Sequence, residues 1–168
     1  MTAPATKTVT KLSENFSLEE FAVSGSHPEL VQPVPIRYQA NVRRLVETIL
    51  QPLRSLWGKR FRILSGYRDA TLNGAVGGSS TSQHRRAEAS DVTTENVRGL
   101  VRAMIVRPNK FPTGQVIYYP SQNFAHIALP SARYEVPTFF VCTGPKQYEL
   151  VRNAADFDRV VARVTGVR

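Results

Sequence analysis

The sequence predicts an α+β fold, with a small and mostly antiparallel sheet flanked by helices. Segments with helical periodicity and short segments with strand alternation follow one another, but in no regular β-α-β order. The segments 115–119 and 124–129 alternate around a Pro-Ser turn, which predicts an antiparallel hairpin. With 168 residues, of which 42% are hydrophobic, the chain is long enough for one domain with a core of its own.

The N-terminal part is expected to begin with a flexible, polar arm over residues 1–12. A short helical turn should follow within 13–21, because Ser17 can cap it and Glu20 stands three residues later, as in a capping box. A long helix is then expected over 37–57. Its apolar stripe consists of Val42, Leu45, Val46, Ile49, Leu53 and Leu56.

Two residues should interrupt and end that helix. Pro52 lacks a backbone donor and is expected to kink or divide the helix, and Gly58 is expected to end it. The central segment should then form, in chain order, a strand at 60–64, a short helix at 69–76, a flexible loop at 77–83, a strand at 87–92 and a helix from Thr93 or Thr94 to Val106.

The last part of the chain, residues 131–168, is expected to be an extension that packs on the domain or on a partner. An apolar run at 138–142 and a strand-like segment at 147–151 come first. A helix at 154–164 should follow, capped by Asn153.

The net charge of +9 is concentrated in the middle of the chain. Residues 37–110 hold 14 Lys and Arg against 5 Asp and Glu, so the two flanks are together neutral. Such a region suits an anionic partner, either nucleic acid, an anionic lipid surface or an anionic cell-wall polymer. It equally suits a solvated surface without a partner. Because no aromatic residues interleave with the basic ones and no nucleic-acid-binding motif is present, nucleic acid is not expected as a partner.

Composition excludes several other classes. No stretch approaches 18 uninterrupted apolar residues, so no membrane span is expected, and the N-terminus lacks the apolar segment of a secretory signal peptide. The one cysteine, Cys142, excludes an intrachain disulfide and a Cys-rich zinc finger. A metal site would therefore need histidine and carboxylate ligands.

Two of the three histidines stand where they can meet one carboxylate. On the strand expected at 87–92, Asp91 would share a face with a small alanine, while Glu88 would face the other way. His84 precedes that strand, and His126 lies within a later one. Two imidazoles and a carboxylate are an ordinary set of three ligands for a catalytic zinc ion. The alternative is a salt bridge at Asp91 and a hydrogen-bonded core histidine at His126.

Four separated motifs follow one another in a recognisable order. They are SGYR at 65–68, LNGAVGGSSTSQH at 72–84, HRRAEASD at 84–91, and QVIYY with FAHIAL within 115–129. Together they resemble the zinc D-alanyl-D-alanine carboxypeptidase family, in particular its small phage-encoded, endolysin-like branch. The segments LSENFSLEEFAVSGS and NVRRLVETILQPLRSLWG are similar to that branch as well. The resemblance implies a zinc D,D-peptidase-like domain over residues 13–130.

The resemblance assigns His84, Asp91 and His126 to the family's three zinc ligands. The reaction it implies is hydrolysis of an amide bond in peptidoglycan stem or cross-link peptides, in which zinc polarises the scissile carbonyl and lowers the pKa of its water toward about 7. A carboxylate must still take a proton from that water and deliver one to the leaving amine.

The resemblance also implies a substrate-binding role for two residues. Arg68 of SGYR matches an arginine near the substrate, whose planar donors can bind a carboxylate in a bidentate manner. Ser82 matches the motif serine and is expected to donate to the same carboxylate. The alternative for Arg68 is a structural salt bridge with Asp69 or Glu47. The family's motif glycine is replaced by Ala87.

The chain departs from the family at the catalytic acid. Members usually carry a Glu or Asp shortly before the last histidine ligand, but here Asn123 stands where the acid is expected, and an amide cannot act as a base. Glu88 is the nearest remaining carboxylate in sequence and is the candidate catalytic residue. Glu135, Tyr118 and Tyr119 are the alternatives.

Two functional hypotheses compete. The first is an active zinc metallopeptidase, encoded by a phage and made in the bacterial host cytoplasm, which acts on the cell wall after release or as part of the virion. The second is a virion-associated structural or binding protein with the same fold and weak or no catalysis. The missing acid favours the second hypothesis, as do the unmatched residues 131–168, whose PTFFVC stretch suits a contact with other virion proteins.

Overall fold

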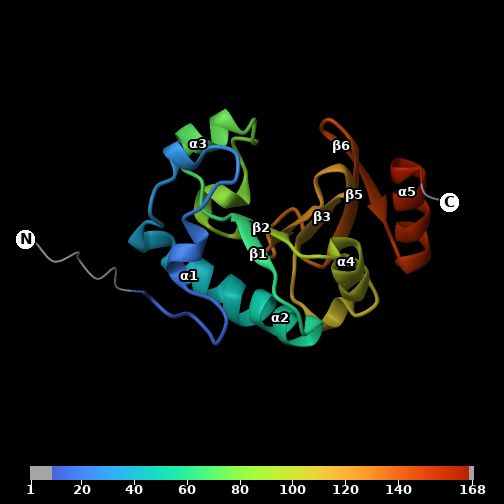
Figure 1. Ribbon diagram of the computed structural model, residues 1–168, viewed down its shortest axis with the longest axis horizontal. Helices are drawn as coiled ribbons and strands as arrows, with labels where there is room; N and C mark the ends of the chain where they lie inside the picture. The colour runs from blue at the N-terminus through green and yellow to red at the C-terminus, as the bar shows by residue number, and fades with distance from the viewer. Residues whose placement is uncertain (1–8, 167–168) are drawn as a thin grey trace, which may run out of the picture.

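The computed structural model describes residues 9–166 and shows one six-stranded sheet with helices packed against it (Figure 1). The strands lie in the order β1 (Arg62–Ser65), β2 (Ala89–Thr93), β4 (Phe124–Ala128), β3 (Gln115–Tyr119), β5 (Thr138–Gly144) and β6 (Gln147–Val151). All neighbouring strands are antiparallel except β3 and β5, which are parallel. The predicted α+β class and the antiparallel β3–β4 hairpin are therefore confirmed.

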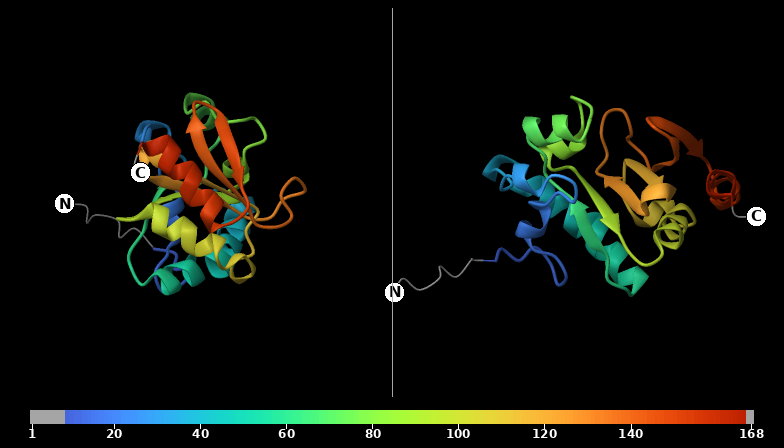
Figure 2. Two further views of the ribbon diagram at one scale, coloured as in Figure 1. Left: turned by 90° about the vertical axis from the view of Figure 1, so that its right-hand side faces the viewer. Right: turned by 45° about the horizontal axis from the view of Figure 1, so that its top comes forward.

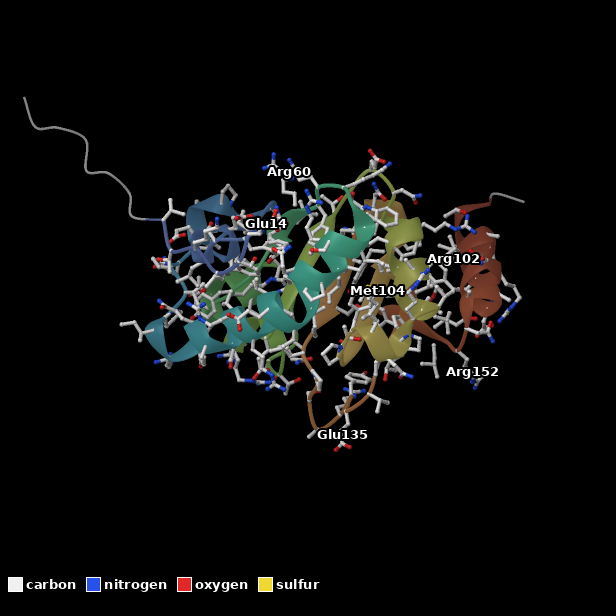
Figure 3. The ribbon with its side chains drawn as sticks, turned by 90° about the horizontal axis from the view of Figure 1, so that it is seen from below. Glu14, Arg60, Arg102, Met104, Glu135 and Arg152 are labelled. Atoms are coloured by element: carbon white, nitrogen blue, oxygen red, sulfur yellow. The ribbon has the colours of Figure 1, made fainter. Side chains whose placement is uncertain are left out.

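The apolar stripe predicted for residues 37–57 is buried except for Leu56, which is 37% exposed. The described residues contain five α-helices. They are α1 (Ile36–Leu45), α2 (Gln51–Trp57), α3 (Ala70–Ala75), α4 (Val97–Ile105) and α5 (Ala154–Thr165). Figure 3 shows α1, α2, α4 and α5 next to one another beneath the sheet. The capping box at Ser17 and Glu20 is formed, at the start of a 3-10 turn, η1 (Leu18–Phe21). Asn153 caps α5, as expected.

The sheet has two unlike faces because side chains alternate along each strand. Val92, Ala125, Val116 and Val141 point toward the helices and are fully buried in the core. The opposite face carries a row of cross-strand neighbours that runs over all six strands. This row consists of Ser65, Asp91, His126, Ile117, Phe140 and Leu150. Ser65 and Asp91 at the start of the row are polar and buried, whereas Leu150 at its end is 45% exposed.

Pro52 divides the long helix as expected, and the division takes the form of one wider, π-helical turn before the proline. Residues Val46–Leu50 form a π-helical turn (η3) between α1 and α2, in which the N–H of Gln51 bonds to the carbonyl of Val46. This wider turn accommodates the missing N–H of Pro52, which then stands in the first turn of α2. Gly58 ends α2 in the left-handed conformation, as predicted.

The predicted start of α4 is wrong. The helix begins at Val97, and its N-cap is Asn96, whose side chain accepts from the N–H of Gly99. The two threonines expected to cap it use their hydroxyls elsewhere: Thr93 donates to the carbonyl of Asn123 and Thr94 to that of Arg60. A hydroxyl that already bonds a neighbouring segment is not available to the helix end.

The termini differ in how they join the fold. Of the expected arm, residues 1–8 lie outside the described residues, while Lys11 pairs with Ser17 and Leu12 is buried. Residues after 130 add β5, β6 and α5 to the same sheet. The division of the chain at residue 130 remains a prediction. Within residues 9–166, no helix combines the length and apolarity needed to cross a bilayer.

Asp158 on α5 joins this helix to α4, and the two helices lie side by side in Figure 2. Its two carboxylate oxygens accept from Arg98, at 2.9 Å, and from Arg102, at 2.8 Å. The hydrogen bonds from Arg102 and then Arg98 lower the pKa of Asp158 below its ordinary value, although partial burial opposes them.

We expect Asp158→Asn to lower the free energy of unfolding by about 0.5–1 kcal/mol at pH 7. Because the folded-state pKa is depressed, this contribution is complete above the unfolded-state pKa near 4 and is lost as pH falls through the folded-state value. Thermal melts of wild type and variant between pH 7 and pH 2.5 should therefore converge at low pH. The matched control is Glu14→Gln at an exposed carboxylate, and a difference between wild type and Asp158→Asn that is constant with pH would contradict the prediction.

Candidate metal centre

Three side chains from separate segments meet on the open face of the sheet. Asp91 on β2 and His126 on β4 are direct cross-strand partners, so their side chains project from the same face. His84 lies on a 3-10 turn, η4 (Gln83–Arg86), which leads into β2 and brings the imidazole over that face. The structure therefore brings together all three residues that the sequence proposes as ligands.

The three potential ligand atoms are close to one another. His84 Nε2 lies 3.2 Å from Asp91 Oδ1 and 3.1 Å from His126 Nδ1, and His126 Nδ1 lies 3.0 Å from Asp91 Oδ1. The ligand atoms of a tetrahedral zinc ion at about 2.0–2.1 Å are roughly 3.3 Å apart. The spacing of the three atoms thus approaches the edges of such a tetrahedron.

A backbone carbonyl fixes the orientation of His84. Its Nδ1 lies 2.7 Å from the carbonyl oxygen of Gly66, which can only accept, so Nδ1 carries the proton and donates it. Nε2 is then left with its lone pair directed at Asp91 and His126. Burial lowers the pKa of the His84 imidazole, which keeps it neutral. A neutral, oriented imidazole is the form that binds a metal ion.

Arg68 binds the second oxygen of Asp91. Its Nη2 donates to Asp91 Oδ2, and its Nε donates to Ser65 Oγ at 2.8 Å. The Asp91 side chain is 10% exposed, and the guanidinium of Arg68 stabilises the charged form of its carboxylate there. Asp91 is therefore an anion with Oδ2 occupied and Oδ1 directed into the cluster.

This donor set fits zinc. His84 Nε2 and Asp91 Oδ1 both present lone pairs, and His126 Nδ1 carries at most one proton to share between them. Lone pairs that converge at such short distances repel one another unless a cation lies between them. Two nitrogens and one carboxylate oxygen leave a fourth tetrahedral position for water or substrate.

Close backbone packing holds the segment after β1, which supplies the carbonyl of Gly66. A Cβ atom added at Gly66 would lie 2.3 Å from the carbonyl oxygen of Phe21, and the N–H of Tyr67 bonds to the same oxygen at 2.8 Å. The turn η1 therefore packs directly on the segment that orients His84, and only glycine fits there.

The loop before His84 is fastened to α3. Asn73 is 4% exposed, and its Nδ2 donates to the carbonyls of Gly78 and Ser79 at 3.2 Å and 3.0 Å. At the other end of η4, Asn41 on α1 donates to the carbonyl of Arg86 at 2.8 Å.

Ala87, which replaces the family's motif glycine, has a φ of 54°. A residue with a Cβ is strained there by about 1 kcal/mol, and glycine would not be.

Of the two residues proposed to bind substrate, Arg68 contacts the cluster through Asp91. Ser82 is the half-buried N-cap residue of η4, and its hydroxyl makes no capping hydrogen bond to that turn. Arg68 does not pair with Asp69 or Glu47, as the structural alternative supposed, because its guanidinium binds Asp91. Neither Ser65 nor Gly66 was identified as functional from the sequence, although both stand in the SGYR motif.

The candidate catalytic residues Glu88, Glu135, Tyr118 and Tyr119 do not lie together as the three potential ligands do. The carboxylate of Glu88 accepts two hydrogen bonds from Arg86, at 3.0 Å and 2.8 Å. Figure 3 shows Glu135 at the tip of the loop between β4 and β5, directed away from the ribbon, and it is exposed. Tyr118 points to the helix side of the sheet, whereas Tyr119 points to the same face as His126.

The comparisons with known proteins agree with this geometry. A family model described as Peptidase M15 matches residues 14–128, more than half of the chain. The matched range includes Arg68, His84, Asp91 and His126, and it ends at the last residue of β4. A search among curated proteins found no match.

We expect Gly66→Ala to destabilise the fold by about 3 kcal/mol, because the added methyl group overlaps the backbone of Phe21. Zinc affinity should fall by roughly 10–100-fold, because the carbonyl that orients His84 is displaced. Thermal unfolding and zinc titration by calorimetry measure the two effects.

Gly74→Ala is the matched control for Gly66→Ala. Gly74 lies within α3, and an added Cβ meets no atom within 4 Å, so this variant should keep its zinc affinity and gain about 0.5–1 kcal/mol in helix stability. Equal zinc affinities for Gly66→Ala and wild type would show that the Gly66 carbonyl does not set the ligand geometry.

Proposed function

Since the chain belongs to the peptidase M15 family, we propose that it is a zinc-dependent D,D-peptidase, carboxypeptidase or endopeptidase, acting on peptidoglycan stem or cross-link peptides. The observation that carries this proposal is the convergence of His84 Nε2, Asp91 Oδ1 and His126 Nδ1 within 3.2 Å of one another. These three residues would hold the ion. When bound, zinc supplies Lewis acidity to the scissile carbonyl and lowers the pKa of a water molecule.

We propose that Arg68 has two tasks. Its Nη2 and Nε hold Asp91 and Ser65, which keeps Asp91 Oδ1 directed at the ion. In the described residues no hydrogen bond is formed by its Nη1, which has two further donors for a substrate carboxylate. Ser82, at the start of η4, is proposed to donate to the same carboxylate.

Glu88 remains the candidate carboxylate for moving protons. Its pairing with Arg86 means that the ion pair would have to open or turn before Glu88 could act as a base. Glu88→Gln tests this role, because a base is lost while the shape of the side chain is kept.

The proposed setting is a phage infection of a bacterium. The protein would be made in the host cytoplasm and would reach the wall after release or within the virion. The excess of positive charge in residues 37–110 supports this setting, because wall polymers are rich in carboxylate and phosphate groups.

A second candidate function is that of a virion-associated structural or binding protein with weak or no catalysis. One observation favours it: no carboxylate stands between Tyr119 and His126, where the family usually carries its acid. The strands and helix after residue 130, outside the family match, would then provide contacts with other virion proteins.

The experiment that separates the two functions is digestion of purified muropeptides, analysed by mass spectrometry, with and without a chelator. We expect wild type to release D-alanine or to separate cross-linked stems, and we expect the chelator and His84→Ala to abolish this cleavage. His84→Ala should also lose its stoichiometric zinc, because one of three ligands is gone. His27→Ala, at a half-buried histidine whose Nδ1 lies 3.2 Å from Glu29, is the control and should behave as wild type.

Two other outcomes of this experiment would contradict the proposal. Bound zinc without cleavage would contradict the peptidase and favour the binding protein. Absence of zinc from wild type, even after incubation with the metal, would contradict the ligand assignment itself.

A further inference from the structure

The face of the sheet that carries the metal ligands also carries the half-buried phenol of Tyr119. Tyr119 lies at the end of β3, where it pairs with Phe124 of β4. Ile117, two residues earlier on β3, pairs with His126. Tyr119 and His126 are therefore diagonal neighbours on one face of an antiparallel pair, a spacing of about 7–8 Å that aromatic side chains can bridge.

Two aromatic rings hold Tyr119 in place. Its ring is stacked on Phe124, with the centroids 4.3 Å apart and the planes at 12°. Tyr148 of β6 meets it edge-on, with centroids 6.2 Å apart and an angle of 80°. Tyr148 lies beyond the residues that the family model matches, so the C-terminal hairpin contributes directly to this face.

Tyr119 lies on the sheet face that carries the ligands, and its phenol remains protonated. Burial raises its pKa above the ordinary value, Tyr148 adds to this, and so does the negative charge of Asp91. A phenol that stays neutral cannot act as a base, but it can donate a hydrogen bond to an oxygen that gains negative charge.

The other candidates for this role are placed less well. Tyr118 projects to the helix side, where its ring packs against Phe157 at 5.7 Å. Glu135 is exposed at a loop tip (Figure 3), and Glu88 is bound by Arg86. Within residues 9–166, Tyr119 is the one among these four whose geometry directs it to the ligand face.

We propose that Tyr119 is a catalytic residue that donates a hydrogen bond to the carbonyl oxygen of the scissile amide, and that Tyr148 of the C-terminal hairpin positions it. This inference rests on the proposed peptidase function. The hydrogen bond strengthens as the carbonyl oxygen becomes negative, so it favours the transition state over bound substrate. No proton is transferred by Tyr119, so this role differs from that of the acid which the family usually carries.

Tyr119→Phe tests the proposal, because it removes the hydroxyl and keeps the ring. For zinc-loaded protein with a purified muropeptide, we expect kcat to fall about 100-fold with little change in KM or zinc content. Tyr118→Phe, one residue away on the opposite face, is the matched control and should keep wild-type kcat. Tyr148→Ala should give an intermediate loss, since the ring of Tyr119 remains but loses its edge contact.

A second readout does not depend on turnover. A phosphinate analogue of D-alanyl-D-alanine places a negative oxygen where the carbonyl oxygen becomes charged. Its affinity, measured by calorimetry on zinc-loaded protein, should fall at least 10-fold in Tyr119→Phe and not in Tyr118→Phe.

The outcomes separate this inference from the proposed function. Cleavage and phosphinate binding that are equal in wild type and Tyr119→Phe would overturn the role of Tyr119 and leave the peptidase intact. If wild type binds the phosphinate but does not cleave, the peptidase function fails and the phosphinate affinities alone decide on Tyr119. If wild type neither cleaves nor binds the phosphinate, both proposals are overturned.

Discussion

The convergence of three lone-pair-bearing atoms from His84, Asp91 and His126 is the constraint around which the rest of this fold is arranged. Placing these atoms within 3.2 Å of one another in a buried site is unfavourable without a cation. Each ligand is held by a partner on its far side or along its strand. The Gly66 carbonyl accepts a hydrogen bond from Nδ1 of His84, Arg68 donates to the second oxygen of Asp91, and the β2–β4 register fixes His126 opposite Asp91. A site assembled in this way would need little rearrangement to bind a metal ion.

The two faces of the sheet differ in composition and in role. The helix side supplies stability through a continuous apolar core, in which residues such as Val92 and Ile127 are fully buried. The other face is polar at β1, β2 and β4, and becomes apolar and more exposed toward β5 and β6. Tyr119 stands where the two regions meet. The hairpin of β5 and β6 therefore contributes to the ligand-bearing face as well as to the core, because Tyr148 packs against Tyr119 on that face.

Local sequence patterns were sufficient to predict much of this arrangement, and non-local contacts explain the rest. Most of the apolar stripe along α1, η3 and α2, the Ser17 capping box and the β3–β4 hairpin follow from residue spacing alone. The motifs predicted that His84, Asp91 and His126 would lie together. The start of α4 was predicted wrongly because Thr93 and Thr94 bond to Asn123 and Arg60, segments about 30 residues away in the chain. The choice of Asp91 as the partner of Arg68 and the packing of Tyr148 on Tyr119 depend on strand pairing, which no local pattern encodes.

The central claim is that His84, Asp91 and His126 bind one zinc ion with two nitrogens and one oxygen. X-ray absorption spectroscopy of the zinc-loaded protein measures the first coordination shell directly. The structure predicts one tightly bound zinc ion with two imidazole nitrogens and light oxygen ligands at about 2.0–2.1 Å, and one imidazole fewer in His126→Ala. A spectrum with six oxygen ligands and no imidazole scattering would contradict the account, because it would place the ion on the surface and away from these three residues.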